Sequence, residues 1–243
     1  MMRPPLLGSQ ASLALLACRR VGEFGSGAVD AGGHSLLRDG DRVVCLGDSI
    51  TADPEGYVTM AREVIRRARP DDSIAIINAA AEGNTAQDML QRFERDVVQH
   101  RPTWVTISAG MNEAALGLPL AEYQGPMTAL VDAAKSAQLK VGLCTPTVFE
   151  ADWVPAAMQR GNGLLQEYNA WLCSVARGRG LLVIPMFEAF QRARQGADAE
   201  SNLRFTHDGV HMAPAGRYLM GLTFLAAFVI SLPTESGEGS EAS

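Results

Sequence analysis

The chain has 243 residues, of which 47% are hydrophobic and 20% charged, which is an ordinary globular composition. Its formal net charge is -6 and its basic residues are scattered, which argues against a nucleic-acid-binding surface. This length suits one α/β domain or two small ones; no linker is visible, so we expect one domain that binds a small molecule.

The N-terminal segment allows two interpretations. An apolar run from Ala11 to Ala17 ends at Cys18 and resembles a weak export signal with a lipoprotein-type cleavage site. The run is short, however, and only Arg3 precedes it, so an unprocessed leader on a cytoplasmic protein fits equally well. We expect residues 1–38 to be a poorly ordered extension before a domain spanning residues 39–231.

Five short apolar runs alternate with longer helical patterns along this domain. Each run is apolar throughout, which is typical of strands buried on both faces of a parallel sheet. The expected strands are Arg42–Leu46, Ile74–Asn78, Trp104–Ser108, Lys140–Cys144 and Leu181–Ile184. Cys45 and Cys144 fall inside these runs, so we expect them to be buried and reduced, and no cysteine or histidine spacing predicts a metal site.

The expected helices carry apolar residues on one face. Thr85–His100 opens with a Thr-x-x-Asp sequence that resembles a capping box, and Pro214 can begin the last helix at its first turn. The others are Leu120–Gln138 and Gly163–Arg177. Such alternation predicts a three-layer α/β/α sandwich around a five-stranded parallel sheet, for which we expect the order 2-1-3-4-5. Ligands then bind where the order reverses, beyond the carboxyl ends of strands 1 and 3.

The C-terminal part contains no predicted membrane span. Tyr218–Ile230 is strongly apolar but too short to cross a bilayer, so we expect a buried helix. Residues 232–243, rich in serine, glutamate and glycine, are expected to be disordered.

Residues suited to acyl transfer follow the first three strands. Ser49 comes after strand 1, Gly83 after strand 2 and Asn112 after strand 3, and Asp208-Gly209-Val210-His211 lies near the C-terminus. A serine hydroxyl becomes nucleophilic when an imidazole takes its proton, and a carboxylate then fixes the tautomer of that imidazole. The backbone N–H groups of Ser49 and Gly83 and the side-chain amide of Asn112 are suitable oxyanion donors.

Each of these elements also has a purely structural explanation. Gly-Asp-Ser is a common turn, Asn112 could cap a helix, and Asp-Gly-Val-His could be a surface turn. The base must be His211 or His207, and we expect His207 to hold its loop by a hydrogen bond. Because all four elements occur in order and the first three directly follow strands, the catalytic interpretation is favoured.

These blocks resemble those of the SGNH hydrolases, also called GDSL esterases/lipases, over about Asp41 to Ile230. The resemblance implies a flavodoxin-like sandwich, no metal or other cofactor, and hydrolysis of esters or thioesters through an acyl-enzyme. It implies that Ser49 is the nucleophile, that Gly83 and Asn112 are oxyanion donors with Ser49, and that Asp208 and His211 complete the triad. Glu113 departs from the family pattern, which usually has aspartate there, and alanines at 80 and 81 stand where a second glycine is common.

The resulting function is a serine esterase that hydrolyses short- to medium-chain carboxylic esters. The alternatives are a carbohydrate O-deacetylase, a lysophospholipase, an acyl thioesterase, an acyltransferase, and a non-catalytic binding module on the same fold. The loop from Thr145 to Phe149, with Trp153, could form a wall of the pocket or belong to the core. No lid-sized insertion is present, so we expect an open, shallow site, and no pattern indicates an oligomeric state.

Overall fold

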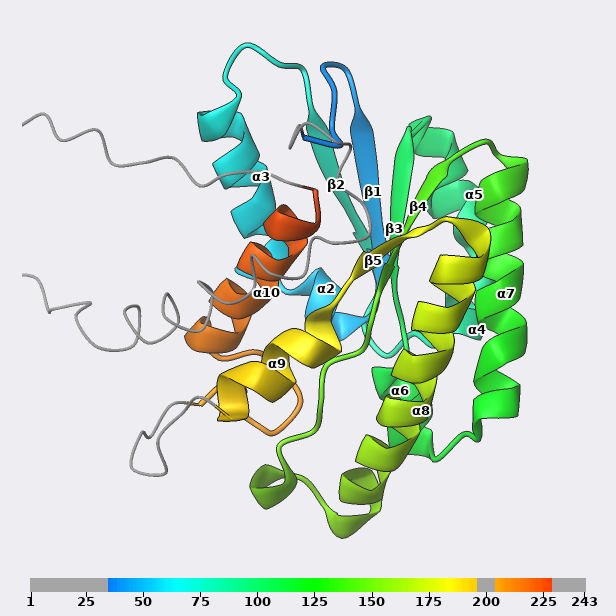
Figure 1. Cartoon of the computed structure of the whole chain (residues 1–243), viewed down its shortest axis with the longest axis vertical. Coiled ribbons are helices and arrows are strands. Elements are labelled where there is room, and N and C mark those ends of the chain that lie inside the picture. Colours follow the sequence, from blue (N-terminus) through cyan, green and yellow to red (C-terminus); the bar gives the residue numbers. More distant parts are fainter. Residues whose placement is uncertain (1–34, 196–203, 229–243) are drawn as a thin grey trace, which may run out of the picture.

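The protein is described by a computed structural model over residues 35–195 and 204–228. In these residues, five parallel strands form one sheet: β1 Arg42–Gly47, β2 Ala75–Ala80, β3 Trp104–Ser108, β4 Lys140–Cys144 and β5 Leu182–Ile184. The strand order β2-β1-β3-β4-β5 confirms the predicted order. Helices α3, α9 and α10 cover one face of the sheet and α4, α5, α7 and α8 cover the other, so the three-layer sandwich is confirmed (Figure 1).

The helices range from one turn to more than six turns. They are α2 Ser49–Ala52, α3 Tyr57–Ala68, α4 Ala86–Gln91, α5 Phe93–Asp96, α6 Met111–Leu116, α7 Leu120–Ser136, α8 Ala156–Arg179, α9 Met186–Gln195 and α10 Pro214–Ala227, with 3-10 turns η2 Val98–His100 and η3 Ala151–Trp153.

The central strands are buried on both faces, as their uninterrupted apolar runs predict. Val43, Val44 and Leu46 of β1 are fully buried, and so is Cys45, which is a free thiol. In the sheet register Gly47 at the end of β1 pairs with Ala80 of β2 and with Ser108 of β3. The segments that leave these three strands therefore start side by side at one edge of the sheet.

The predicted helix at 85–100 is three short elements instead of one. Its capping box is present, because Thr85 and Asp88 each accept the other's backbone N–H. The helix is interrupted at Arg92, whose backbone has φ -106° and ψ 5°, and again at Val97. The dihedrals of Arg92 lie outside the helical region, and α5 ends at Val97, although the apolar spacing stays helical.

Helix α8 starts at Ala156, seven residues before its predicted start. Pro155 precedes it directly, and Gly161 lies inside it, where a Cβ would be only 2.8 Å from the Ala114 carbonyl oxygen. That glycine allows close packing against α6 and is not a helix end.

Helix α10 begins with Pro214 in its first turn, as predicted, and packs against α3, where the Tyr57 and Phe224 rings lie 5.4 Å apart. Among the described residues, none of the helices combines the length and apolar character that crossing a membrane requires. The tail predicted at residues 232–243, and residues 1–34 of the predicted leader, lie outside the described part of the chain.

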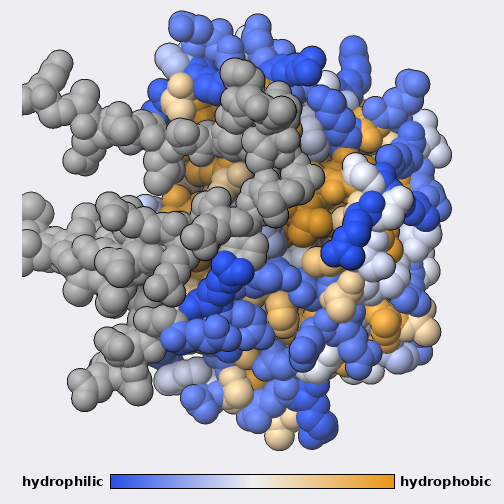
Figure 2. Space-filling view, in the orientation of Figure 1, coloured by the Kyte–Doolittle hydropathy of each residue, from blue (hydrophilic) through white to orange (hydrophobic). Residues whose placement is uncertain are grey.

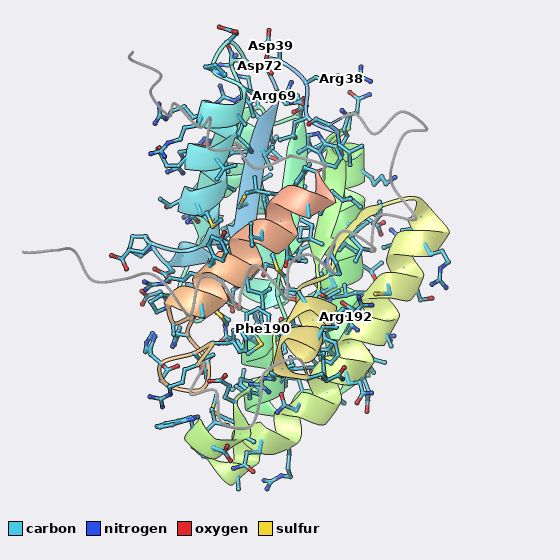
Figure 3. The ribbon with its side chains drawn as sticks, turned by 60° about the vertical axis from the view of Figure 1, so that its left-hand side comes forward. Arg38, Asp39, Arg69, Asp72, Phe190 and Arg192 are labelled. Carbon is cyan, nitrogen blue, oxygen red and sulfur yellow. The ribbon has the colours of Figure 1, made fainter. Side chains whose placement is uncertain are left out.

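The end of the molecule opposite the carboxyl ends of the strands is held by charged side chains. The Arg69 guanidinium donates to the Leu37 carbonyl oxygen at 2.7 Å and pairs with Asp72, and the Ser73 N–H donates to Asp39 at 2.7 Å. Figure 3 shows Arg69, Asp72 and Asp39 together at that end. Elsewhere hydrophilic residues predominate on the described part of the face in Figure 2, with hydrophobic ones scattered among them.

Candidate active site

The first feature of the site is a tight turn from β1 into α2. Ser49 is the first residue of α2, and the carboxylate of Asp48 caps the helix by accepting the Ile50 N–H at 3.0 Å. A Cβ at Gly47 would collide with the Thr51 side chain, so only glycine fits this turn. The turn places Ser49 beyond the carboxyl end of β1 (Figure 1).

Two hydrogen bonds connect Ser49 to His211 and His211 to Asp208, although Ser49 lies 162 positions before His211 in the sequence. The His211 Nε2 atom lies 3.0 Å from Ser49 Oγ, and His211 Nδ1 lies 2.6 Å from Asp208 Oδ2. The other Asp208 oxygen accepts the backbone N–H groups of Val210 and His211 at 2.9 and 2.7 Å. Burial raises the pKa of Asp208, but these hydrogen bonds outweigh it and lower the pKa to about 2, so the carboxylate stays charged.

The loop that carries Asp208 and His211 is anchored by Glu150. The Glu150 carboxylate accepts the Thr206 hydroxyl and pairs with Arg194 at 3.4 Å, and its backbone N–H donates to the Gly209 carbonyl oxygen at 2.9 Å. Gly209 has φ 91°, and a Cβ there would lie 2.5 Å from Val154 Cγ1, which explains glycine at this position.

Helix α9 also supports this loop. Phe190 of α9 (labelled in Figure 3) packs its ring edge-on against the Phe205 ring, with ring centroids 5.6 Å apart. An antiparallel bridge between Thr206 and Met212 closes the loop around Asp208 and His211. The loop that carries His211 and Asp208 is therefore held by Glu150 and by helix α9.

A pocket of about 560 Å³ lies at this edge of the sheet and contains all three expected oxyanion donors. Ser49, Gly83 and Asn112 line it together with His211. Gly83 has φ 72° and no atom crowds the position that a Cβ would occupy, so its backbone is open to the pocket. The structure thus brings together the residues that the sequence predicts for the site, apart from Asp208, which contacts the pocket through His211.

The side-chain amide of Asn112 is fixed by one hydrogen bond. Its Nδ2 donates to the Asn84 carbonyl oxygen at 2.8 Å, and Gly110, not Asn112, is the N-cap of α6. The helix-cap alternative for Asn112 is therefore wrong. Because an amide nitrogen carries two hydrogens, the second remains for an acceptor in the pocket.

Glu113 connects the starts of two helices at the base of the site. It is buried, and its oxygens accept the Gly110 N–H at 2.9 Å and the Ala86 N–H at 2.6 Å. Burial raises the pKa of Glu113. The longer glutamate side chain thus bridges α6 and α4 while Asn112 lines the pocket.

His207 differs from its expected role. Its ring is 60% exposed and lines the pocket, and its Nε2 lies 4.0 Å from Asp208 Oδ2. Within the described residues its side chain makes no hydrogen bond that could hold the loop, so that prediction is wrong. His207, Asp208 and His211 are the one described cluster with metal-ligand spacing, their ligand atoms lying within 4.8 Å of one another. Both ring nitrogens of His211 are engaged in the hydrogen bonds to Asp208 and Ser49, which suits proton transfer.

The loop after β4 is core and not a pocket wall. Phe149 is fully buried and Thr145 and Thr147 are nearly so, and neither this loop nor Trp153 lines the pocket. Trp153 is 54% exposed and the Arg204 guanidinium stacks 3.4 Å from its ring centre.

The sequence did not indicate the charged rim of the pocket. Arg217 of α10 donates to Asp53 at 2.7 Å and pairs with Glu55, joining the last helix to the segment after α2. Arg217, Asp53 and Glu82 line the pocket beside apolar Ile50, Pro54 and Met212. No motif or spacing predicts a contact between residues 164 positions apart.

Comparisons with known proteins agree with this geometry. The model of the GDSL-like Lipase/Acylhydrolase family matches residues 45–219. An acetylxylan esterase from Geobacillus stearothermophilus is 26% identical over 213 residues, which cover 78% of this chain and 94% of that protein. Thioesterase 1/protease 1/lysophospholipase L1 from Escherichia coli is 25% identical over 97 residues, 40% of this chain and 47% of that protein.

Solved structures show the same fold. A catalytic mutant of the Geobacillus stearothermophilus acetylxylan esterase superimposes with a TM-score of 0.70 at 22% identity, covering 82% of this chain and 99% of that one. A lipase/acylhydrolase from Enterococcus faecalis superimposes with a TM-score of 0.66 at 24% identity, covering 78% and 95%.

Proposed function

The chain belongs to the GDSL-like lipase/acylhydrolase (SGNH) family and is a carboxylester hydrolase, and on that premise we propose that it cleaves short- to medium-chain carboxylic esters through an acyl-enzyme on Ser49. The observation that carries the proposal is the hydrogen-bonded series Ser49–His211–Asp208, with 3.0 and 2.6 Å between the paired atoms. A non-catalytic binding module would not need this alignment.

The first half of the reaction forms the acyl-enzyme. The Ser49 Oγ attacks the ester carbonyl carbon while His211 Nε2 takes its proton, and Asp208 stabilises the resulting imidazolium. The Ser49 and Gly83 N–H groups and the free Asn112 N–H stabilise the oxyanion. When the tetrahedral intermediate collapses, the ester C–O bond breaks and His211 returns the proton to the leaving alcohol.

Water completes the second half. His211 removes a proton from water as its oxygen attacks the acyl carbon, and the proton then passes to Ser49 Oγ as the acid leaves. If an alcohol or sugar hydroxyl takes the place of water, the same residues transfer the acyl group. An acceptor assay that quantifies new ester against free acid separates the two outcomes.

The pocket lining supports short acyl chains. Within the described part of the chain, three apolar side chains line it, those of Ile50, Pro54 and Met212, beside the charged Asp53, Glu82 and Arg217. Each buried methylene is worth about 0.8 kcal/mol, so a chain gains affinity only as far as apolar surface extends. We expect kcat/KM on nitrophenyl esters to be highest from acetyl to hexanoyl, with little hydrolysis of emulsified long-chain triglyceride. A preference for chains of about twelve carbons or more would contradict this and favour a lysophospholipase or long-chain thioesterase.

The second candidate is a carbohydrate O-deacetylase. The charged rim offers hydrogen-bonding groups to a polar alcohol, and the acetylxylan esterase is a relative over most of both chains. The measurement is kcat/KM on acetylated xylooligosaccharides beside nitrophenyl acetate in the same buffer. A higher kcat/KM on the sugar, despite its poorer leaving group, would favour the deacetylase, and undetectable sugar deacetylation would exclude it.

A further inference from the structure

Arg92 lies at the break between α4 and α5, and its side chain is only 10% exposed. The guanidinium Nη2 donates to the Gly47 carbonyl oxygen at 3.0 Å, and Nη1 donates to the Ala79 carbonyl oxygen at 2.6 Å. Its Nε donates to Asn84 Oδ1 at 2.6 Å, and Nη1 also pairs with Asp96 at 3.0 Å. One side chain thus connects the ends of β1 and β2 with the loop that follows β2.

These acceptors adjoin the three proposed oxyanion donors. Gly47 lies two residues before Ser49 on the turn into α2, and Asn84 directly follows Gly83. The carbonyl oxygen of Asn84 also accepts the Asn112 side chain at 2.8 Å. The guanidinium is therefore linked to Ser49 through the turn that starts at Gly47, and to Gly83 and Asn112 through Asn84. It does not line the pocket itself.

We propose that Arg92 is a positioning residue that sets the spacing of the Ser49, Gly83 and Asn112 donors around the oxyanion. The inference rests on the proposed function, because only acyl transfer makes that spacing matter. Oxyanion donors act by being fixed before charge develops, so a small displacement of the donors weakens them.

Arginine suits this position and lysine does not. A guanidinium presents five N–H groups in a rigid planar fork, which lets it serve acceptors that lie in different directions. A lysine ammonium is a single point on a flexible chain and cannot reach the Gly47, Ala79 and Asn84 acceptors together. Asp96 balances the charge of Arg92, which removes much of the cost of burying it.

The matched test compares Arg92→Lys with Arg95→Ala. Arg95 also pairs with Asp96, but its side chain is 70% exposed and bonds none of these loops. We expect Arg92→Lys to lower kcat on nitrophenyl acetate by roughly 10- to 100-fold with KM nearly unchanged. Arg95→Ala should keep the wild-type kcat. Wild-type kcat in Arg92→Lys, or an equal loss in Arg95→Ala, would overturn the inference.

A double-mutant cycle with Asn112→Ala separates positioning from general destabilisation. If Arg92 acts through the oxyanion donors, Arg92→Lys should cost much less in the Asn112→Ala background than in the wild type. Multiplicative losses in kcat would overturn the inference. If Arg92→Lys shows no cooperative thermal unfolding, Asn84→Ala takes its place with the same expected loss and the same coupling, because it removes the Oδ1 acceptor of Arg92 and keeps the backbone carbonyl that Asn112 uses.

The proposed function and the role of Arg92 are contradicted by different results. A wild-type enzyme that hydrolyses no ester contradicts the proposed function. An active wild type together with an unaffected Arg92→Lys contradicts only the role of Arg92.

Discussion

Asn112 and Asp48 show how single side chains acquire their roles from one or two hydrogen bonds. Asn112 donates one amide hydrogen to the Asn84 carbonyl oxygen. Because that bond fixes the amide group, it also fixes the direction of the second amide hydrogen. Asp48, one residue before the nucleophile, is buried and accepts the Ile50 N–H. Each arrangement leads to a measurable prediction.

The first prediction concerns the oxyanion. Asn112→Ala should lower kcat by roughly 10²- to 10³-fold with little change in KM, because its free N–H matters most as charge builds on the carbonyl oxygen. Steady-state kinetics on nitrophenyl butyrate measure both constants. The control is Asn169→Ala, since Asn169 donates to Glu188 at 2.9 Å and does not line the pocket. A rise in KM with an unchanged kcat would assign Asn112 to ground-state binding.

The second prediction concerns pH and stability. Burial, reinforced by the nearby Glu113 carboxyl, raises the pKa of Asp48 from its ordinary 3.8 to about 7. Between these two values the folded protein binds a proton at Asp48 that the unfolded chain releases, so Asp48 makes stability fall as pH rises through that window. Asp48→Asn keeps a cap acceptor and cannot titrate.

Thermal unfolding from pH 4 to 8 tests this assignment. The Tm of wild type relative to Asp48→Asn should decline as pH increases toward 7 and then level off. A Tm difference that is independent of pH, or one that grows in favour of wild type, would show that Asp48 is ionised in the folded protein.

Site residues were predictable from the sequence where a residue type suited to acyl transfer directly follows a predicted strand. Ser49, Gly83 and Asn112 each follow a strand, so their meeting follows from parallel topology. The roles of Arg92 and Arg217 were not predictable from the sequence. Arg92 contacts a residue 45 positions away and Arg217 contacts one 164 positions away, and such contacts leave no local pattern. The expected role of His207 failed for a related reason, since a loop's exposure depends on what packs around it.

At the scale of elements, buried strands were the most predictable and helix limits the least. Strands β3 and β4 both have their predicted limits, because each is a short, largely apolar segment between helical patterns. The predicted helix limits were wrong around Arg92 and around Gly161. One breaks a helix whose apolar spacing is continuous, and the other lies inside a helix despite its low propensity.

The third prediction concerns the loop from Phe205 to Met212. Glu150→Ala removes the acceptor of the Thr206 hydroxyl and the partner of Arg194, so the loop that carries Asp208 and His211 should open more often. We expect a several-fold loss of kcat/KM and faster amide hydrogen exchange in this loop. Glu63→Ala, which breaks an exposed ion pair on α3, is the control and should change neither. Unchanged exchange and activity in Glu150→Ala would show that the loop does not depend on this anchor.

At the scale of the whole molecule, strand order decides where the chemistry lies. The reversal at β1, with β2 on one side and β3 on the other, brings three successive strand ends to one edge. The loop before α10 brings His211 to Ser49, and α10 itself places Arg217 against the segment after α2. The rule that ligands bind where the strand order reverses was sufficient to place the site. The shape and charge of the pocket depend on individual side chains, which topology does not specify.

Site-resolved mass spectrometry after reaction with a fluorophosphonate tests most directly whether Ser49 is the nucleophile. We expect one adduct per chain, mapped to Ser49, because His211 Nε2 lies 3.0 Å from the Ser49 hydroxyl. Labelling should vanish in Ser49→Ala, slow strongly in His211→Ala and remain at the wild-type rate in Ser136→Ala, a serine at the end of α7. An adduct on a different serine, or wild-type ester hydrolysis by Ser49→Ala, would show that Ser49 is not the nucleophile.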